Sequence, residues 1–292
     1  MIVAVEAYLA LRRAAGYSMR DADRILRSYG RFASARRDRF VYIATILAWA
    51  GRARSPERRE ALVRKVALLA RHLHAEDPRH EIPSYRVFAQ DPFRRPQPFI
   101  FTPAQIAALV SRARRYAPNG EVLATLLGLL AATGLRISEA LSLRLDDLTS
   151  DGLRVRETKC HKSRLVPLHP TVERELAGFV RRRPLALTDR IFVGVRGGPL
   201  PYARVKRAFR ELLLAIGIDP RSSPRPRLHC LRHTFAVRAL EGSHSKTIAE
   251  HQLALATYLG HATVASTYWY LEAAPDLLRS ISRGCERFAR AR

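Results

Sequence analysis

The sequence has few cysteines and no long apolar run. Its three cysteines, Cys160, Cys230 and Cys285, are odd in number and lack C-x-x-C spacing, so neither a disulfide framework nor a zinc ribbon is supported. The longest apolar stretch, residues 122–132, falls short of the roughly 20 residues that a membrane helix needs. The N-terminal segment has no basic start and contains Glu6, unlike an export signal. We therefore expect a cytoplasmic protein that does not contact a membrane.

Acidic residues are also scarce beside the basic ones. The chain has 26 Asp and Glu against 51 Lys and Arg, a net charge of +25, and the excess runs along most of its 292 residues. Cations in this number, most of them Arg, favour a polyanionic partner, and nucleic acid is the first hypothesis because phosphate neutralisation supplies affinity. An Arg-rich genome composition is the alternative explanation. A hydrophobic content of 47% over this length predicts about two domains, each with a core.

The N-terminal region, residues 1–88, is expected to be helical throughout. Apolar residues recur at spacings of three and four, with Val5, Leu9 and Leu11 as the first set, and predict helices near 2–15, 19–35, 41–51 and 56–74. Ser18 and Ser55 are the expected N-caps of the second and fourth helices. Cations on the outward faces could follow a DNA backbone or could simply be solvated: Arg12, Arg13, Arg20, Arg24, Arg27, Arg58, Arg59, Arg64 and Lys65.

Repeated prolines and arginines mark residues 89–101 as a linker, so the second domain is expected over 102–292. It opens with Thr102 as N-cap, Pro103 at the first helical position and Gln105 reaching back. Alternating residues at 153–156 and 164–168 predict a small antiparallel sheet. Further helices are expected near 171–182, 202–215 and 229–241, with two or three shorter ones up to the C-terminus.

Two segments of this domain place cations at helix starts, where backbone N–H groups favour phosphate. In ATGLRISEALSL (131–142), Arg136 opens a helix and Glu139 can meet it on one face, although an ordinary surface pair would look the same. In LHCLRHTF (228–235), His229, Arg232 and His233 project from one side of a helix. His229 and Arg232 could bind one phosphate, or the two histidines could bind a metal, but Cys230 stands where H-E-x-x-H has its Glu.

A third segment, YLGHATVASTYWYL (258–271), has His261 after a glycine and Tyr270 nine residues later. Its aromatic cluster could equally be core, and Tyr268 is a rival for any role given to Tyr270. Elsewhere, Asp146 and Asp147 are adjacent, and neighbouring residues on a helix point apart, so a two-metal nuclease site is poorly supported.

Taken together, Arg136, Lys159, His229, Arg232, His261 and Tyr270, in that order, resemble the catalytic residues of the tyrosine recombinase (phage integrase) family. The resemblance covers residues 100–285. Within it, the sequence of 258–271 is more similar to transposon- or plasmid-encoded members than to chromosomal Xer proteins. It implies a mainly α fold, with a four-helix, SAM-like core-binding domain and an α-rich catalytic domain that carries a small antiparallel sheet.

The resemblance also implies a role for each residue. Tyr270 would attack a phosphodiester and form a 3′-phosphotyrosine, with Arg136 and Arg232 on the phosphate oxygens. His229 would accept the phenolic proton, His261 would bind phosphate, and Lys159 would protonate the departing oxygen. Neither metal nor ATP is expected, and Glu139 would orient Arg136, while His233 would be structural.

The expected partner is a pair of double-stranded DNA recombination sites, bound by four protomers that are monomeric in free solution, with helper recombinases as a further option. The tail from 276 to 292 would dock on a neighbouring subunit or on its own domain. Two other functions stay open: a type IB topoisomerase, which shares this chemistry, and a non-catalytic DNA-binding accessory protein. Strand exchange would exclude the first and a covalent adduct the second.

Overall fold

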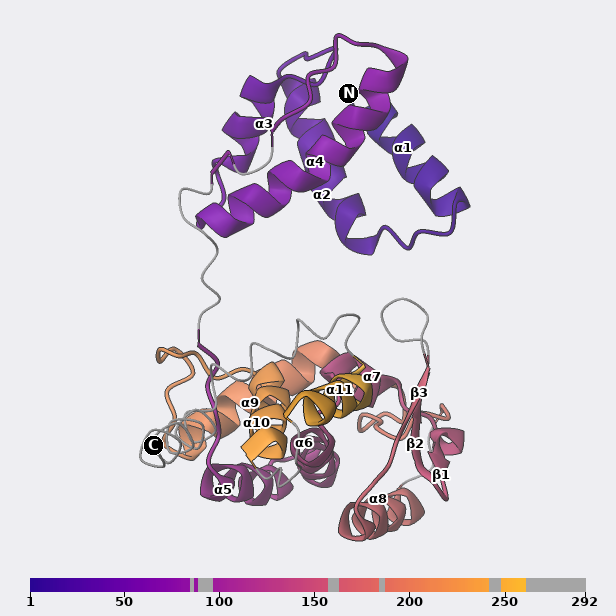
Figure 1. The fold of residues 1–292 in the computed structure, drawn as a ribbon, viewed down its shortest axis with the longest axis vertical. Helices are drawn as coiled ribbons and strands as arrows, with labels where there is room; N and C mark the ends of the chain where they lie inside the picture. Colours follow the sequence, from indigo (N-terminus) through magenta and orange to yellow (C-terminus); the bar gives the residue numbers. More distant parts are fainter. Residues whose placement is uncertain (85–86, 89–96, 157–162, 184–186, 242–247, 261–292) are drawn as a thin grey trace, which may run out of the picture. The chain divides into compact units, whose positions relative to one another are not determined.

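A computed structural model describes all of the chain except residues 85–86, 89–96, 157–162, 184–186, 242–247 and 261–292 (Figure 1). The chain divides into two compact units, Met1–Arg95 and Pro96–Arg292, and each is described by itself. Helices dominate both units, and the only strands of the described part belong to one sheet of three. None of the described helices combines the length and the apolar character needed to cross a bilayer.

Unit 1 contains the four helices predicted from the sequence: α1 (Ile2–Ala14), α2 (Arg20–Ala35), α3 (Ile43–Ala50) and α4 (Pro56–Glu76). Both α1 and α3 pack against α2 and against α4, so the four helices share one core that includes Val5, Leu9 and Tyr29. Leu11 was expected in this core but is 52% exposed. It lies two residues after Leu9, which is roughly 200° around the helix, so both cannot face inward.

The two expected N-caps of unit 1 have different outcomes. Ser55 caps α4 as predicted, because its Oγ accepts a hydrogen bond from the Arg58 N–H at 3.3 Å. The prediction for Ser18 is wrong: α2 follows Met19, whose backbone is left-handed (φ 46°) and whose side chain makes no capping bond. The chain therefore enters α2 through a turn at Met19 instead of through a serine cap.

Unit 2 begins with α5 (Pro103–Arg114), where the predicted reciprocal bonds between Thr102 and Gln105 are both present at 2.9 and 3.1 Å. The second helix, α6 (Gly120–Thr133), buries a row of leucines and packs against helices on several sides, as Figure 1 shows near the middle of this unit. The remaining helices are α7 (Ile137–Ser142), α8 (Pro170–Arg182), α9 (Tyr202–Ala215), α10 (Leu228–Glu241) and α11 (Ile248–Leu259).

The predicted hairpin of unit 2 is confirmed as β2 (Gly152–Val155) and β3 (Arg164–Val166), which pair antiparallel. A third strand, β1 (Leu148–Thr149), joins the sheet beside β2 and was not predicted. Alternation sends Leu153, Val155 and Val166 into the core. The register sets Arg164 opposite Val155 at the start of β3, where this strand contacts α11.

Candidate active site

The first part of the site is the turn between α6 and α7. Gly134 ends α6 in the left-handed conformation (φ 62°), and a Cβ there would come within 2.5 Å of the Phe235 ring. Arg136 then precedes α7, and the Glu139 carboxylate accepts hydrogen bonds from the Arg136 backbone N–H at 2.9 Å and from its Nη1 at 2.7 Å. The predicted contact between Arg136 and Glu139 is therefore confirmed, with the carboxylate buried under the turn.

The second part is the first two turns of α10, which carry His229, Arg232 and His233. The guanidinium of Arg232 donates from Nη1 to the Gly134 carbonyl at 2.8 Å and from Nη2 to the Leu259 carbonyl at 2.7 Å. His229 lies one turn before His233, and the two rings meet edge to face with centroids 4.5 Å apart. Arg232 thereby ties the end of α6 to the end of α11, two segments far apart in the sequence.

The third part is the C-terminal end of α11, where three successive carbonyls each accept an arginine. Tyr258 O accepts from Arg164 Nε at 2.9 Å, Leu259 O from Arg232 Nη2 at 2.7 Å and Gly260 O from Arg136 Nη2 at 3.2 Å. The last carbonyls of a helix have no partner within it and carry the negative end of its dipole. The helix end thus gathers three guanidinium groups directly before His261.

Glu139 is the acidic centre of this cluster. It is 6% exposed and pairs with Arg164 as well, which donates from Nη1 at 3.2 Å and from Nη2 at 2.9 Å. Burial opposes its ionisation, but hydrogen bonds from Arg164 and Arg136 outweigh that effect and lower the pKa of Glu139 to about 2. Glu139 thus pairs with two of the three guanidinium groups at the end of α11, and the excess of two positive charges in the cluster suits a phosphodiester.

Arg164 is the part of the site that sequence analysis did not single out. The sequence assigned it only to a strand, yet its side chain, 12% exposed, bonds Glu139 and Tyr258 at once. A cation at an alternating strand position next to a predicted turn was the one available signal, and it is shared with many surface arginines. Arg164 positions Glu139, and through it Arg136, without being placed on substrate.

Arg136 and Arg232 differ in how open they are. The Arg136 side chain is 28% exposed, whereas Arg232 is 1% exposed among its carbonyl partners. Both were expected to bind phosphate oxygens. In this structure Arg136 offers the open guanidinium, and Arg232 fixes the backbone on which that guanidinium rests.

His229 has an unusually low proton affinity for a histidine. Protein atoms around the ring hinder solvation of its charged form, and the nearby Arg232 and Arg136 cations act in the same direction, which lowers the pKa of His229 to about 4. The side chain nevertheless keeps an exposed edge. His229 is therefore a neutral imidazole at physiological pH, and the burial and charges that keep it neutral also make it a weaker base.

Three of the six predicted catalytic residues lie outside the described residues: Lys159, His261 and Tyr270, together with the rival nucleophile Tyr268. The structure brings together the other three, Arg136, His229 and Arg232. His233 is half-buried against His229. Across the described part of the chain, no three His, Cys, Asp or Glu side chains cluster in a way that could hold a metal ion.

Asp146 and Asp147 do not point apart as expected. They lie in a short 3₁₀ turn (Leu145–Asp147), and both carboxylates contact Arg156, Asp146 at 2.6 Å. Neighbouring side chains of a 3₁₀ turn are about 120° apart, but Arg156 joins the two carboxylates because it reaches Asp147 with Nε and Asp146 with Nη2. Both carboxylates thus pair with the guanidinium directly after β2, and Asp147 also accepts from the Arg144 backbone N–H at 2.9 Å.

Comparison with known proteins gives the same assignment over most of the chain. A model of the phage integrase family matches residues 100–276. "Putative integrase/recombinase y4rB" of Sinorhizobium fredii is 33% identical over 97% of this chain and 96% of its own length. Tyrosine recombinase XerC of Mesorhizobium japonicum is 39% identical over 50% of this chain and 45% of its own length.

Among solved structures, the Tn1549 transposon integrase in complex with circular intermediate DNA has a similar fold. It superposes with a TM-score of 0.66 at 18% identity, over 95% of this chain and 99% of that one. The family match covers the helices and the sheet that build the arginine cluster described above. The chain belongs to the phage integrase family, the tyrosine recombinases that carry out site-specific DNA recombination.

Proposed function

We propose that this chain binds double-stranded recombination sites and cleaves one strand at a time with Tyr270. The observation that carries the proposal is the gathering of Arg136, Arg232 and His229 at the end of α11, one residue before His261. Tyr270 follows nine residues later in the sequence. A nucleophile so close along the chain to a cationic cluster suits attack on a phosphodiester.

The arginines would act on the phosphate. Arg136 would bind a non-bridging oxygen through its open guanidinium and Arg232 would act beside it, so that charge building in the transition state meets fixed cations. Glu139 and the α11 carbonyls hold these groups before substrate arrives. If the loss of either arginine is equivalent to the removal of one oxyanion-hole donor, it raises the activation barrier of cleavage by roughly 3–4 kcal/mol.

The proton transfers use the remaining groups. A phenol is about one part in a thousand ionised at pH 7, so neutral His229 would take the proton as the Tyr270 oxygen bonds to phosphorus. The bond to the 5′ oxygen breaks, and Lys159 would give that oxygen a proton, while His261 would donate to the phosphate. One phosphodiester is exchanged for another, so the 5′-hydroxyl of a second strand can reverse the step without metal or ATP.

We assign the regions accordingly. Residues 1–88 would form the core-binding domain, 89–101 the linker and 102–292 the catalytic domain. Four protomers would assemble on two DNA sites from monomers in solution, with the tail after residue 275 docked in cis or in trans and with helper recombinases in some reactions. We place the chain among recombinases of transposons or plasmids, acting in the cytoplasm on the nucleoid.

A suicide-substrate assay tests this proposal. Nicked duplexes that carry candidate sites from the flanking element are incubated with the protein in chelator. Wild type is expected to form a slow-migrating covalent adduct, Tyr270→Phe none, and the matched Tyr268→Phe variant an adduct like wild type. An adduct that survives in Tyr270→Phe and is lost in Tyr268→Phe would move the nucleophile to Tyr268.

Paired sites then separate recombination from simple relaxation. Two labelled duplexes that bear the same site are expected to yield recombinant products with the wild-type protein. Relaxation of supercoiled DNA without exchange would favour a topoisomerase. Binding without an adduct on every candidate site would favour an accessory DNA-binding protein.

A further inference from the structure

The last residues of the predicted linker, 97–101, are packed into unit 2, and we call them the linker end. In Figure 1 they pass α10 before they lead into α5. The Phe101 ring is fully buried and lies edge to face with the rings of Phe99 and Phe209, whose centroids are 4.8 and 6.4 Å away. Ile100, between the two phenylalanines, packs against apolar residues that α10 and α11 share. The linker end thus contributes side chains to two clusters of the core.

The linker end is also bonded to the helix that carries the site. The Phe101 backbone N–H donates to Thr234 Oγ1 at 2.9 Å, and that hydroxyl donates to the Cys230 carbonyl, one turn earlier in α10, at 2.8 Å. Burial raises the pKa of the Cys230 thiol, and hydrogen bonds from the Arg227 and Phe99 backbones oppose that rise, so Phe99 lies against the same face of α10. Because Thr234 is 2% exposed, water has no access to replace its bonds.

Thr234 and Cys230 lie on the side of α10 away from Arg232. Each is two residues from Arg232, which is roughly 200° around a helix. On its own side, Arg232 donates to the carbonyls of Gly134 and Leu259. The helix is therefore held on two opposite sides, by the linker end and by Arg232, and this arrangement resists rotation about the helix axis.

Rotation of α10 matters because both His229 and Arg232 project from it. A turn of about 10° moves a group roughly 6 Å from the axis by about 1 Å, and a misplacement of about 1 Å can slow a reaction roughly 100-fold. We propose that Thr234 is a positioning residue for strand cleavage: its bond to the Phe101 amide sets the rotation of α10 and thereby the direction of His229 and Arg232. The proposal rests on the cleavage chemistry proposed above and adds a buried residue to it.

Two substitutions separate the hydroxyl of Thr234 from its packing. Thr234→Val keeps the shape of the side chain but leaves the Phe101 N–H without its acceptor, whereas Thr234→Ser keeps the hydroxyl and loses one methyl group. At saturating DNA, Thr234→Val is expected to form the covalent adduct about 10- to 100-fold more slowly than wild type. The DNA concentration that gives half the maximal rate should not change. Thr234→Ser is expected to restore most of the rate.

Thr45→Val is the matched control. Thr45 is a buried threonine of unit 1, 3% exposed, and its hydroxyl donates to Asp38 at 2.7 Å. The substitution removes the same group from a similarly buried position without changing α10, so the adduct rate at saturating DNA should equal that of wild type. A rate as low as that of Thr234→Val would attribute both losses to reduced stability and would contradict a positioning role.

NMR titration of the His229 imidazole measures its position without DNA. The wild-type pKa of about 4 depends on burial of the ring and on neighbouring arginine charges, both of which change if α10 turns. Thr234→Val is expected to raise the pKa of His229 toward the ordinary value of 6.5, whereas Thr234→Ser and Thr45→Val should leave it near 4. The titration needs no cleavage, so it tests the position of His229 even if no Tyr270 adduct forms.

Three results would overturn the proposal. The first is a Thr234→Val variant that matches wild type in adduct rate and in titration. The second is a raised pKa with an unchanged adduct rate, because rotation would then not affect cleavage. The third is a Thr234→Ser variant as impaired as Thr234→Val, which would assign the effect to packing of the methyl group.

A second variant applies if circular dichroism shows that Thr234→Val does not fold. Ile100→Ala removes a half-buried side chain of the linker end and leaves the hydroxyl of Thr234 in place. It is expected to slow adduct formation and to raise the pKa of His229, while Ile106→Ala, half-buried on α5, should do neither. Wild-type behaviour of Ile100→Ala in both measurements would contradict the proposal.

Discussion

At the scale of single residues, the site depends on a buried carboxylate that organises cations. Glu139 contacts Arg136 and Arg164, and its ionised form is the one that the fold requires. Buried charges are stabilising only while their partners are present, because removing one leaves the other uncompensated. Both pKa values are lowered in the fold, so the contributions of Glu139 and His229 to stability should both fall as pH falls, between 4.5 and 2 for Glu139 and between 6.5 and 4 for His229.

Glu139→Gln is expected to lower the free energy of unfolding by roughly 3–5 kcal/mol at pH 7, because two arginines lose their anion. The pKa of Glu139 is about 2 in the folded chain and has an ordinary value of 4.5, so the carboxylate stabilises the fold fully above pH 4.5. That contribution is lost as pH falls through 2. Urea unfolding at several pH values should show the gap between wild type and variant narrow below pH 4.5.

The matched control is Glu175→Gln. This carboxylate is 74% exposed and lies 3.8 Å from Arg114, so its removal should change stability by less than about 1 kcal/mol at any pH. Equal losses in the two variants would show that burial of Glu139 is irrelevant to its contribution.

His229 is expected to stay neutral well below pH 6. Its lowered pKa, about 4, follows from hindered solvation and from the charges of Arg232 and Arg136. Arg136→Gln removes one of those charges and should raise the pKa of His229 toward the ordinary value of 6.5. NMR titration of the imidazole carbons, assigned with His229→Gln, measures both values. A wild-type midpoint near 6.5 would contradict the electrostatic account.

At the scale of elements, the site forms where the ends of several helices meet. The turn after α6, the N-terminal part of α10 and the last turn of α11 are each short, and arginine hydrogen bonds join them. Gly260 is a tight point in this arrangement, because its φ is 66° and a Cβ would lie 2.7 Å from Arg164 Nη1. The end of α11 and the orientation of Arg164 are therefore coupled.

Gly260→Ala is expected to displace Arg164 and to slow covalent adduct formation at saturating DNA by at least about tenfold. Gly217→Ala is its matched control, since Gly217 is also left-handed (φ 76°) but a Cβ added there would meet no atom within 4 Å. Both should lose roughly 1–2 kcal/mol of stability to backbone strain, and only Gly260→Ala should lose cleavage rate. Equal rates in the two variants would separate Arg164 from catalysis.

At the scale of the whole molecule, the dominant property is a net charge of +25 over 292 residues. Ion pairs within the described part engage some of the arginines, as with Arg13 and Arg27 in unit 1. The excess favours DNA through release of the counterions that surround it, a contribution that does not depend on base sequence. Salt should therefore weaken binding to DNA of any sequence.

Binding to an arbitrary duplex is expected to weaken by roughly 10³- to 10⁵-fold between 50 and 200 mM salt, the range for 6–10 phosphate contacts. Fluorescence anisotropy with a labelled duplex in a potassium chloride series measures this slope. A duplex of equal length and scrambled sequence should give a similar slope. An affinity that hardly changes with salt would indicate few phosphate contacts despite the charge.

The helices and the hairpin were predictable because their signals are local. Apolar spacing, the caps at Ser55 and Thr102 and the alternation in β2 and β3 act over a few residues, and the structure confirms them. The failures were local as well: Leu11 shares the apolar character of Leu9 but not its face, and Ser18 lost the cap position to a turn at Met19. In both cases the residue type was suitable for the predicted role, but its position relative to the helix was not.

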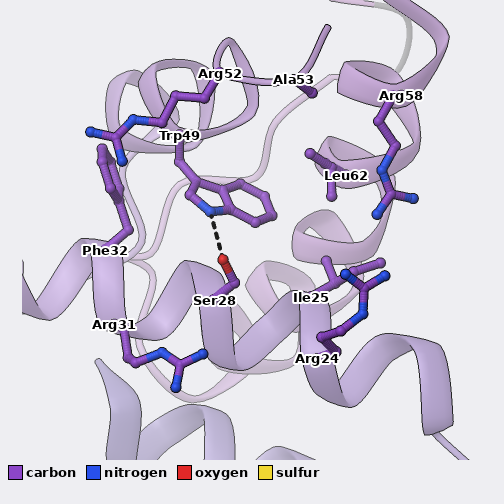
Figure 2. Close-up of a pocket in the computed structure, with 10 residues that line it drawn as sticks. All are labelled: Arg24, Ile25, Ser28, Arg31, Phe32, Trp49, Arg52, Ala53, Arg58 and Leu62. Atoms are coloured by element: carbon purple, nitrogen blue, oxygen red, sulfur yellow. Dashed lines mark hydrogen bonds between the residues drawn. The ribbon is translucent and has the colours of Figure 1, made fainter. Parts of the chain in front are cut away.

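Motif order and spacing along the chain were enough to mark Arg136, His229 and Arg232 as candidates for the site. How these side chains meet depends on the packing of distant elements. Arg136 reaches Gly260 across 124 residues of chain, and Arg164 reaches Glu139 from a strand 25 residues away. In unit 1, too, residues from separate helices come together only in the folded chain: Arg24, Arg31, Arg52 and Arg58 line one cavity with Trp49 (Figure 2). Hydrogen bonds between distant segments form only once the elements have packed, and no local pattern encodes that packing.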